Sequence, residues 1–286
     1  MAELFRRPLG LALSGGGALG CWQTAALRAL EMDFGLVFDA VLGFSAGALT
    51  GSSYCLGRME EAVARWREID GGIMRFSPRL WPPSIFSERP IWQDVAFALD
   101  DERAKERARC RFIVASARVK RDKLVYGVFT PGGIEGWDAP LAAHLVASCS
   151  IPLVFPRQRL VHRGEAVVLI DGGIPCEEPM SFNALGSCRD VLVLEMVRPE
   201  EMGVAARGFF KSFDQKGRET VRRVIDAGVS SLLGQAQPPR VFRLPPSRVL
   251  DFTMLDFSAG KLQEGLRRGE ADARAFMSRP EDWRVA

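Results

Sequence analysis

Histidine is scarce in this sequence, and closely spaced cysteines are absent. The 286 residues include only two histidines, and none of the six cysteines belongs to a C-x-x-C pair. Structural and catalytic zinc sites are built from closely spaced cysteines and histidines, so the sequence predicts no metal site. The cysteines are instead typical of small buried hydrophobic side chains in a reducing compartment.

The chain also lacks a large net charge and long apolar runs. A formal charge of +3 is too small to predict a nucleic-acid partner. No stretch approaches the roughly 18 uninterrupted apolar residues of a membrane span. The N-terminal FRRPLGLALSGGGALGC has two arginines before a mildly apolar run, as export signals do, but glycines interrupt that run. We therefore expect no export signal and a cytoplasmic location, with peripheral membrane contact left open.

The composition is that of an ordinary globular protein. Hydrophobic residues make up 47% of the chain and charged residues 26%, which is enough apolar material for a sizeable core. The length lies within the range of a single α/β domain. Neither a repeat nor a low-complexity tract divides the chain, so the sequence predicts one domain over residues 1–286.

The first seventy residues alternate between strand and helix patterns. LGLAL (9–13) and FDAVLGF (38–44) are short apolar runs typical of buried parallel strands. Helices are expected over 21–32, from about Ser45 onward, and over 59–70. This alternation predicts a parallel sheet with crossover helices.

The rest of the chain continues the mixture of strands and helices, with one exception. Strands are expected at 111–119, 124–130, 166–171, 190–196 and 239–244, and helices at 137–150, 217–233 and 259–277. The stretch 73–92 contains four prolines and four large aromatic residues, a pattern that predicts neither helix nor strand.

A G-x-S-x-G motif stands between an expected strand and an expected helix. In this motif, GFSAG (43–47), a tight turn would strain the serine backbone, and the flanking glycines would prevent clashes. The hydroxyl of Ser45 would then point out at the C-terminal edge of the sheet. The next helix would direct its dipole and free N–H groups toward developing negative charge. The alternative is an ordinary turn, since such short motifs also occur by chance.

The loop SGGGALG supplies backbone groups that such a nucleophile needs. Gly15, Gly16 and Gly17 lack Cβ atoms, so their N–H groups can approach a substrate oxygen and form an oxyanion hole. The same loop also matches the dinucleotide motif G-x-G-x-x-G. A dinucleotide site would require an acidic residue at the end of the second strand, where Phe44 and Ser45 stand instead. The absence of G-K-[ST] excludes a nucleoside-triphosphatase phosphate loop.

The base that would activate Ser45 is the less obvious part of the site. His144 falls on an apolar helical stripe typical of a structural histidine, and His162 falls in an expected exposed hairpin or loop. VVLIDGGI places Asp171 at the end of a buried strand, at the C-terminal edge of a parallel sheet, where α/β sites assemble. An Asx-capped turn is the alternative. Beside Ser45 and the glycine loop, a Ser45–Asp171 dyad is the preferred hypothesis, and it requires apolar surroundings that make the aspartate a stronger base.

Three motifs follow one another along the chain: the triglycine loop, G-x-S-x-G and D-G-G. In this order they resemble the motifs of the patatin-like phospholipases, a family of lipid acyl hydrolases that use a Ser-Asp dyad. ASCSIPLVFP (147–156) is similar to the segment before the family's aspartate. The resemblance covers residues 9 to about 196, which leaves a strand and helices in 197–286. It implies a three-layer α/β/α sandwich around a mostly parallel sheet, and hydrolysis of lipid carboxylic esters through an acyl-enzyme without metal or cofactor. The implied roles are nucleophile for Ser45, base for Asp171, and oxyanion loop for Gly15, Gly16 and Gly17.

One position departs from the family's pattern. The basic residue that usually precedes the last glycine of the loop is Leu19 here. A cation there would order the loop or meet an anionic head group, so the resemblance does not extend to strong phospholipid selectivity. Backbone donors would still stabilise an oxyanion.

Two further questions stay open at the level of sequence. The aromatic stretch 73–92, with Arg75, Arg79 and Arg89, suits a membrane interface, a substrate lid, or a loop folded onto the core. The alternative functions are a catalytically weak protein that binds lipids or membranes and, less favoured, a nucleotide-binding oxidoreductase.

Overall fold

The main sheet follows from the alternating strand and helix patterns. A computed structural model describes residues 4–69, 74–81, 83–204 and 209–285. Within these residues the sheet has eight strands in the order β10-β9-β1-β2-β5-β8-β7, with β6 also paired to β5. The strands are β1 (Leu9–Leu13), β2 (Ala40–Gly43), β5 (Arg111–Arg118), β6 (Leu124–Phe129), β7 (Gln158–His162), β8 (Glu165–Asp171), β9 (Asp190–Leu194) and β10 (Arg240–Leu244).

Strand direction changes at β5. β10, β9, β1, β2 and β5 run parallel, whereas β6 and β8 both pair antiparallel to β5. β2 pairs with β5 only as far as Val114, and β8 pairs with the part of β5 beyond that point, with Asp171 opposite Ser116. Asp171 therefore ends an antiparallel strand. The expectation that it ends a parallel strand is wrong, because the β7–β8 hairpin folds back along the free end of β5.

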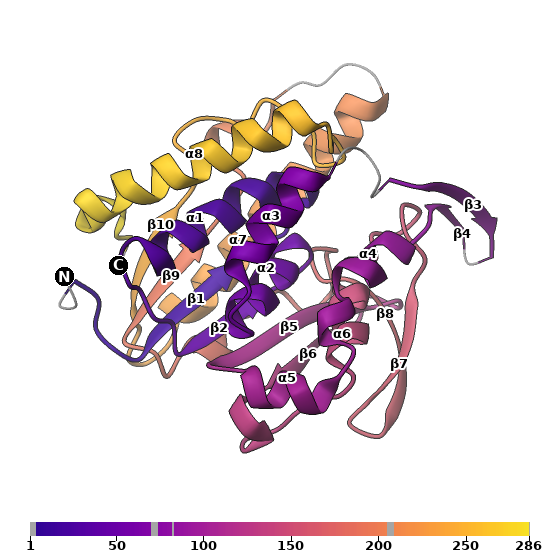
Figure 1. The fold of residues 1–286 in the computed structure, drawn as a ribbon, viewed down its shortest axis with the longest axis horizontal. Coiled ribbons are helices and arrows are strands. Elements are labelled where there is room, and N and C mark those ends of the chain that lie inside the picture. The colour runs from indigo at the N-terminus through magenta and orange to yellow at the C-terminus, as the bar shows by residue number, and fades with distance from the viewer. Residues whose placement is uncertain (1–3, 70–73, 82, 205–208, 286) are drawn as a thin grey trace.

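Helices cover both faces of the sheet, which confirms the predicted three-layer α/β/α sandwich around a mostly parallel sheet (Figure 1). Successive strand residues point to opposite faces: Leu11 and Leu13 pack on one side and Ala12 on the other. α7 (Phe209–Leu233) packs against the face that holds Ala12. The other face carries α1 (Gly20–Met32), α2 (Ala46–Cys55), α3 (Met59–Glu68), α4 (Arg89–Asp94), α5 (Asp101–Arg107), α6 (Leu141–Ser148) and α8 (Ala259–Ser278).

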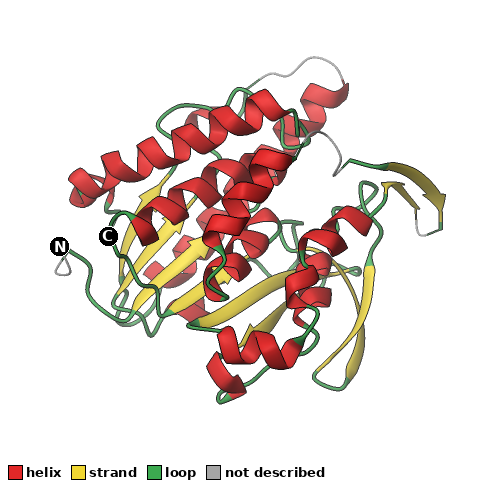
Figure 2. Cartoon of the chain, in the orientation of Figure 1, coloured by secondary structure: helices red, strands yellow, loops and turns green. Residues whose placement is uncertain are grey.

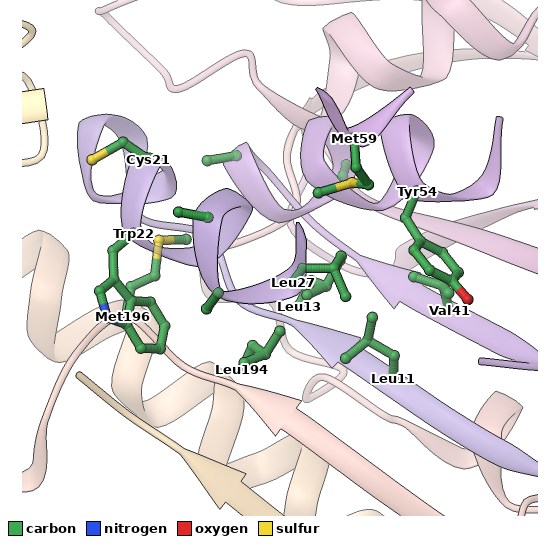
Figure 3. Packing of buried hydrophobic residues seen from close by; sticks show 14 of the residues in the cluster. Leu11, Leu13, Cys21, Trp22, Leu27, Val41, Tyr54, Met59, Leu194 and Met196 are labelled. Carbon is green, nitrogen blue, oxygen red and sulfur yellow. The ribbon is translucent and has the colours of Figure 1, made fainter. Parts of the chain in front are cut away.

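α1 lies at the centre of the larger core. Figure 3 shows Leu27 of α1 packed near Leu13 of β1 and Val41 of β2. α8 covers the outer side of α1, and the indole N–H of Trp22 donates to a carboxylate oxygen of Asp272 at 2.8 Å. α1 thus lies between the sheet and α8. This explains why it is buried over most of its surface, although its sequence pattern predicts one apolar face.

The segment 73–92 contains regular structure, so the expectation of neither helix nor strand is wrong. β3 (Phe76–Leu80) and β4 (Pro83–Phe86) form an antiparallel hairpin that stands away from the body, and α4 follows it (Figures 1 and 2). Ile73 and Pro82 lie outside the described residues. Prolines are tolerated in edge strands, where an N–H is not needed for the ladder. In the part of the chain that is described, no helix is long and apolar enough to cross a membrane.

Candidate active site

The turn that holds Ser45 connects β2 to α2. Ser45 has φ 55° and ψ −132°, a region that residues with side chains rarely adopt. Both flanking glycines are sterically required. A Cβ atom at Gly43 would lie 2.5 Å from the carbonyl oxygen of Gly47, and one at Gly47 would lie 2.4 Å from the carbonyl oxygen of Leu13. The turn is therefore packed tightly against the end of β1.

The end of α6 joins the Ser45 turn to Asp171. The N–H of Ser45 donates to Oγ of Ser148 at 2.9 Å, and the Ser148 hydroxyl donates to the carbonyl oxygen of Ala115 at 2.6 Å. Two residues on, the carbonyl oxygen of Ser150 accepts the N–H of Asp171 at 3.0 Å. Ser148 is not among the site residues expected from sequence, where its one signal is a serine at the end of an apolar helix.

The contact between Ser148 and Ser45 leads to a prediction. Ser148→Ala leaves the buried Ser45 N–H without its acceptor, which costs roughly 1–3 kcal/mol of unfolding free energy. The strained Ser45 backbone loses a fixed support, so for the ester hydrolysis that the resemblance implies, kcat should fall more than KM changes. Urea unfolding and steady-state kinetics measure both effects.

A neighbouring serine provides the control for this variant. The Ser150 hydroxyl donates to the carbonyl oxygen of Val146, within its own helix turn, while its backbone carbonyl holds Asp171. Ser150→Ala keeps that carbonyl and should retain activity. Equal losses of kcat in the two variants would contradict a positioning role for Ser148.

Asp171 is buried close to Ser45. Oδ1 accepts the N–H of Gly173 at 2.7 Å, and Oδ2 has no hydrogen-bond partner among the described residues. Burial raises the pKa of Asp171 to about 6, although the Ser45 hydroxyl and the Gly173 N–H both lower it. The structure thus brings the two residues together, with a carboxylate that is ionised at neutral pH and more basic than an exposed aspartate. Hydrogen bonds between catalytic groups commonly tighten only when substrate is bound.

The glycine loop lies beside the same turn. A Cβ atom at Gly15 would lie 2.9 Å from Cβ of Ser45, and one at Gly17, where φ is 55°, would lie 2.1 Å from the carbonyl oxygen of Met254. The N–H groups of Gly15, Gly16 and Gly17 donate no hydrogen bond to any residue that the structure describes. Leu19 is fully buried in the core, so this position presents no side chain to a ligand.

Ser45 and Gly17 line a cavity of about 530 Å³ whose walls are largely apolar. The indole of Trp66 is fixed there by a hydrogen bond to Thr24 Oγ1 at 2.9 Å and by stacking on Phe257. Charged residues also contribute to the lining, and two of them, Arg65 and Asp94, pair with each other at 2.6 Å. The apolar lining includes Leu49, Trp66, Ile91, Phe97, Ile151, Phe155 and Phe257. A cavity of this size and polarity accommodates a small apolar ligand beside the serine.

Comparison with known families decides what kind of protein carries this arrangement. A sequence model of the patatin-like phospholipase family matches residues 11–179. The chain belongs to the patatin-like phospholipase family. The matched residues include the glycine loop, the G-x-S-x-G turn and Asp171. Members of this family are generally hydrolases that act on lipid esters.

Two solved structures resemble this patatin-like chain. VipD from Legionella pneumophila is 13% identical, and the alignment covers 96% of this chain and 67% of VipD with a TM-score of 0.48. ExoU, solved as a heterodimer with SpcU from the type III secretion system of Pseudomonas aeruginosa, gives 18% identity and a TM-score of 0.34. That alignment covers 97% of this chain and 61% of the matched one, so the chain spans about three fifths of its length. The comparison with curated proteins gave no match.

The two histidines lie elsewhere in this patatin-like fold. His144 is fully buried on α6 and packs against Phe129 and His162, with ring centroids 5.6 and 5.3 Å away. Burial lowers the pKa of His144 to about 4, and neither of its ring nitrogens has a hydrogen-bond partner among the described residues. His162 ends β7 in the β7–β8 hairpin. Neither histidine lines the cavity, and the described residues contain no cluster of three or more groups arranged to hold a metal ion.

Proposed function

We propose that this patatin-like protein is a serine acyl hydrolase that cleaves carboxylic ester bonds of lipids. The observation that carries the proposal is the position of Ser45, held in a strained turn beside the buried Asp171 and at the wall of an apolar cavity. A strained serine, a raised carboxylate pKa and unpaired backbone N–H groups are the components that acyl transfer requires. Gly15, Gly16 and Gly17 form the oxyanion hole in this proposal.

The reaction proceeds in two halves. Ser45 Oγ bonds to the ester carbonyl carbon while its proton passes to Asp171, and the glycine N–H groups stabilise the negative carbonyl oxygen. Collapse of this intermediate breaks the ester C–O bond, and Asp171 returns the proton to the leaving alkoxide. Water then attacks the acyl-enzyme, gives a proton to Asp171, and releases the fatty acid as Ser45 recovers its hydrogen. Neither half requires a metal or a cofactor.

The cavity lining favours recognition of the acyl chain over recognition of a charged head group. Its walls are mostly aliphatic and aromatic. Two arginines contribute to the lining, but Arg65 is paired with Asp94, and Arg58 lies over the ring of Phe97, 5.0 Å from its centroid. With the buried Leu19 in place of the family's basic residue, this arrangement supports a lipid esterase with broad head-group tolerance.

Labelling with a fluorophosphonate, which reacts with activated serines, tests the proposal. We expect a covalent adduct on Ser45 that is absent in Ser45→Ala. Ser53→Ala is the matched control, because Ser53 lines the same cavity but donates to the carbonyl oxygen of Leu49 within α2. Labelling that persists in Ser45→Ala would refute the assignment of the nucleophile. Loss of labelling in a folded His144→Ala variant would show that the Ser45–Asp171 dyad is the wrong assignment.

A further inference from the structure

The β3–β4 hairpin carries a group of large apolar side chains that the fold leaves in solvent. Phe76, Leu80, Trp81 and Ile85 are 72%, 97%, 80% and 46% exposed, and Leu153, in the segment beside β4, is 62% exposed. We call these five residues the hairpin face. Isolated exposed hydrophobic residues are common on protein surfaces, but a group of this kind marks an interaction site.

We propose that the hairpin face docks the protein on an anionic lipid bilayer. This inference deepens the proposed function, since it identifies where lipid substrate is met. Basic side chains accompany the apolar ones: Arg75 is exposed on the hairpin, and the guanidinium of Arg157 lies 5.3 Å from the centroid of the Trp81 ring. A tryptophan next to cations is typical of groups that sit at the level of lipid head groups.

The hairpin face is connected to the cavity through backbone and ring contacts. The N–H groups of Ile85 and Phe86 donate to the carbonyl oxygens of Leu153 and Val154, each at 2.9 Å. The Phe86 ring lies between those of Phe76 and Phe155, with centroid separations of 6.4 Å on both sides. Phe155 lines the cavity that contains Ser45. An apolar series of rings therefore leads from the exposed hairpin to the cavity wall.

The hairpin is poorly suited to the main competing partner, an added β-strand from another protein. Pro78 interrupts β3, the outer strand, and Pro83 begins β4. A proline lacks the N–H that a pairing strand would need, and prolines on edge strands are a device against such pairing. A bilayer makes no demand on backbone hydrogen bonding at its surface and uses the side chains alone.

Co-sedimentation with vesicles tests this proposal in the Ser45→Ala protein, so that the result is independent of ester turnover. We expect binding to vesicles of equimolar phosphatidylcholine and phosphatidylglycerol, weaker binding to phosphatidylcholine alone, and loss of binding as salt is raised. The double variant Leu80→Ser/Trp81→Ser should bind at least about tenfold more weakly. It removes two large apolar side chains whose transfer from water into the bilayer would favour binding. Ile134→Ser, which alters a side chain that is 88% exposed in another part of the surface, should bind as before.

The outcomes separate the docking proposal from the proposed function. Vesicle binding without ester turnover in the wild-type protein would support docking and overturn the proposed hydrolase function. Absence of vesicle binding, or equal binding by the double variant and the Ile134 control, would overturn docking. Sedimentation in solution completes the test. If the protein does not bind vesicles but forms a dimer, and the double variant is a monomer, the hairpin face serves self-association instead.

Discussion

Asp171→Asn is expected to lower kcat for ester hydrolysis by about 10²–10⁴-fold while stabilising the fold at neutral pH. The amide keeps an oxygen that can accept the Gly173 N–H but cannot take the Ser45 proton. Fluorophosphonate labelling of Ser45 should slow to a similar extent. A variant that hydrolyses esters at the wild-type rate would contradict the role of Asp171 as the base.

The expected gain in stability follows from the raised pKa of Asp171. In the unfolded chain this carboxyl has a pKa near 3.8, and in the fold burial raises it to about 6. Its contribution to stability is therefore fully present below pH 3.8 and is lost as the pH rises through 6, a loss of about 3 kcal/mol. Asparagine does not titrate. The advantage of Asp171→Asn in urea unfolding should thus be larger at pH 7.5 than at pH 4.5, and an equal difference at both values would argue against a buried, raised carboxyl.

The same pKa predicts how the proposed activity of the wild-type protein responds to acid. Ser45 can transfer its proton only to the ionised carboxylate, so kcat/KM should fall about tenfold per pH unit below about 6. A profile that stays flat down to the pKa of an ordinary aspartate would show that Asp171 is not the titrating base.

Gly47→Ala is expected to destabilise the protein by more than about 4 kcal/mol or to prevent folding. The new Cβ atom would lie 2.4 Å from the carbonyl oxygen of Leu13 and 2.5 Å from that of Ser14. Both are backbone atoms at the end of β1, so relief of the clash requires movement of the sheet or of the Ser45 turn. Thermal unfolding measures the effect.

A glycine in open space provides the control. A Cβ atom at Gly260 in α8 would meet nothing within 4 Å. Gly260→Ala should therefore be neutral or stabilise the helix by roughly 0.5–1 kcal/mol. If Gly47→Ala unfolded at the wild-type temperature, the close packing of the Ser45 turn against β1 would be disproved.

The parts of the fold that depend on local pattern could be predicted from the sequence. Apolar runs at 9–13 and 38–44 indicated β1 and β2. The tight turn predicted from the G-x-S-x-G motif leaves no space for a Cβ atom at Gly43 or Gly47. Strand direction could not be predicted in the same way. β8 has the apolar pattern of a buried strand whether it runs parallel or antiparallel to β5, because pairing partners are chosen by tertiary contacts.

Two further features depended on contacts between distant segments. The hydroxyl of Ser148 meets the N–H of Ser45 across 103 positions of sequence, and no local pattern encodes such a pairing. Proline disrupts a strand in the interior of a sheet but is tolerated in an edge strand. The sequence alone does not reveal that β3 and β4 form a separate two-stranded hairpin, in which both strands are edges.

The stretch 148–155 makes contacts that none of its residues would suggest individually. Its first residue supports the Ser45 backbone, its third holds the N–H of Asp171, and its last turn is hydrogen-bonded to β4. Ser45, Asp171 and the β3–β4 hairpin are thus all hydrogen-bonded to one short segment of the chain. Leu153 lies only three residues from Ser150 and five from Ser148, so a rearrangement of this segment would affect the attachment of the hairpin and the support of both Ser45 and Asp171.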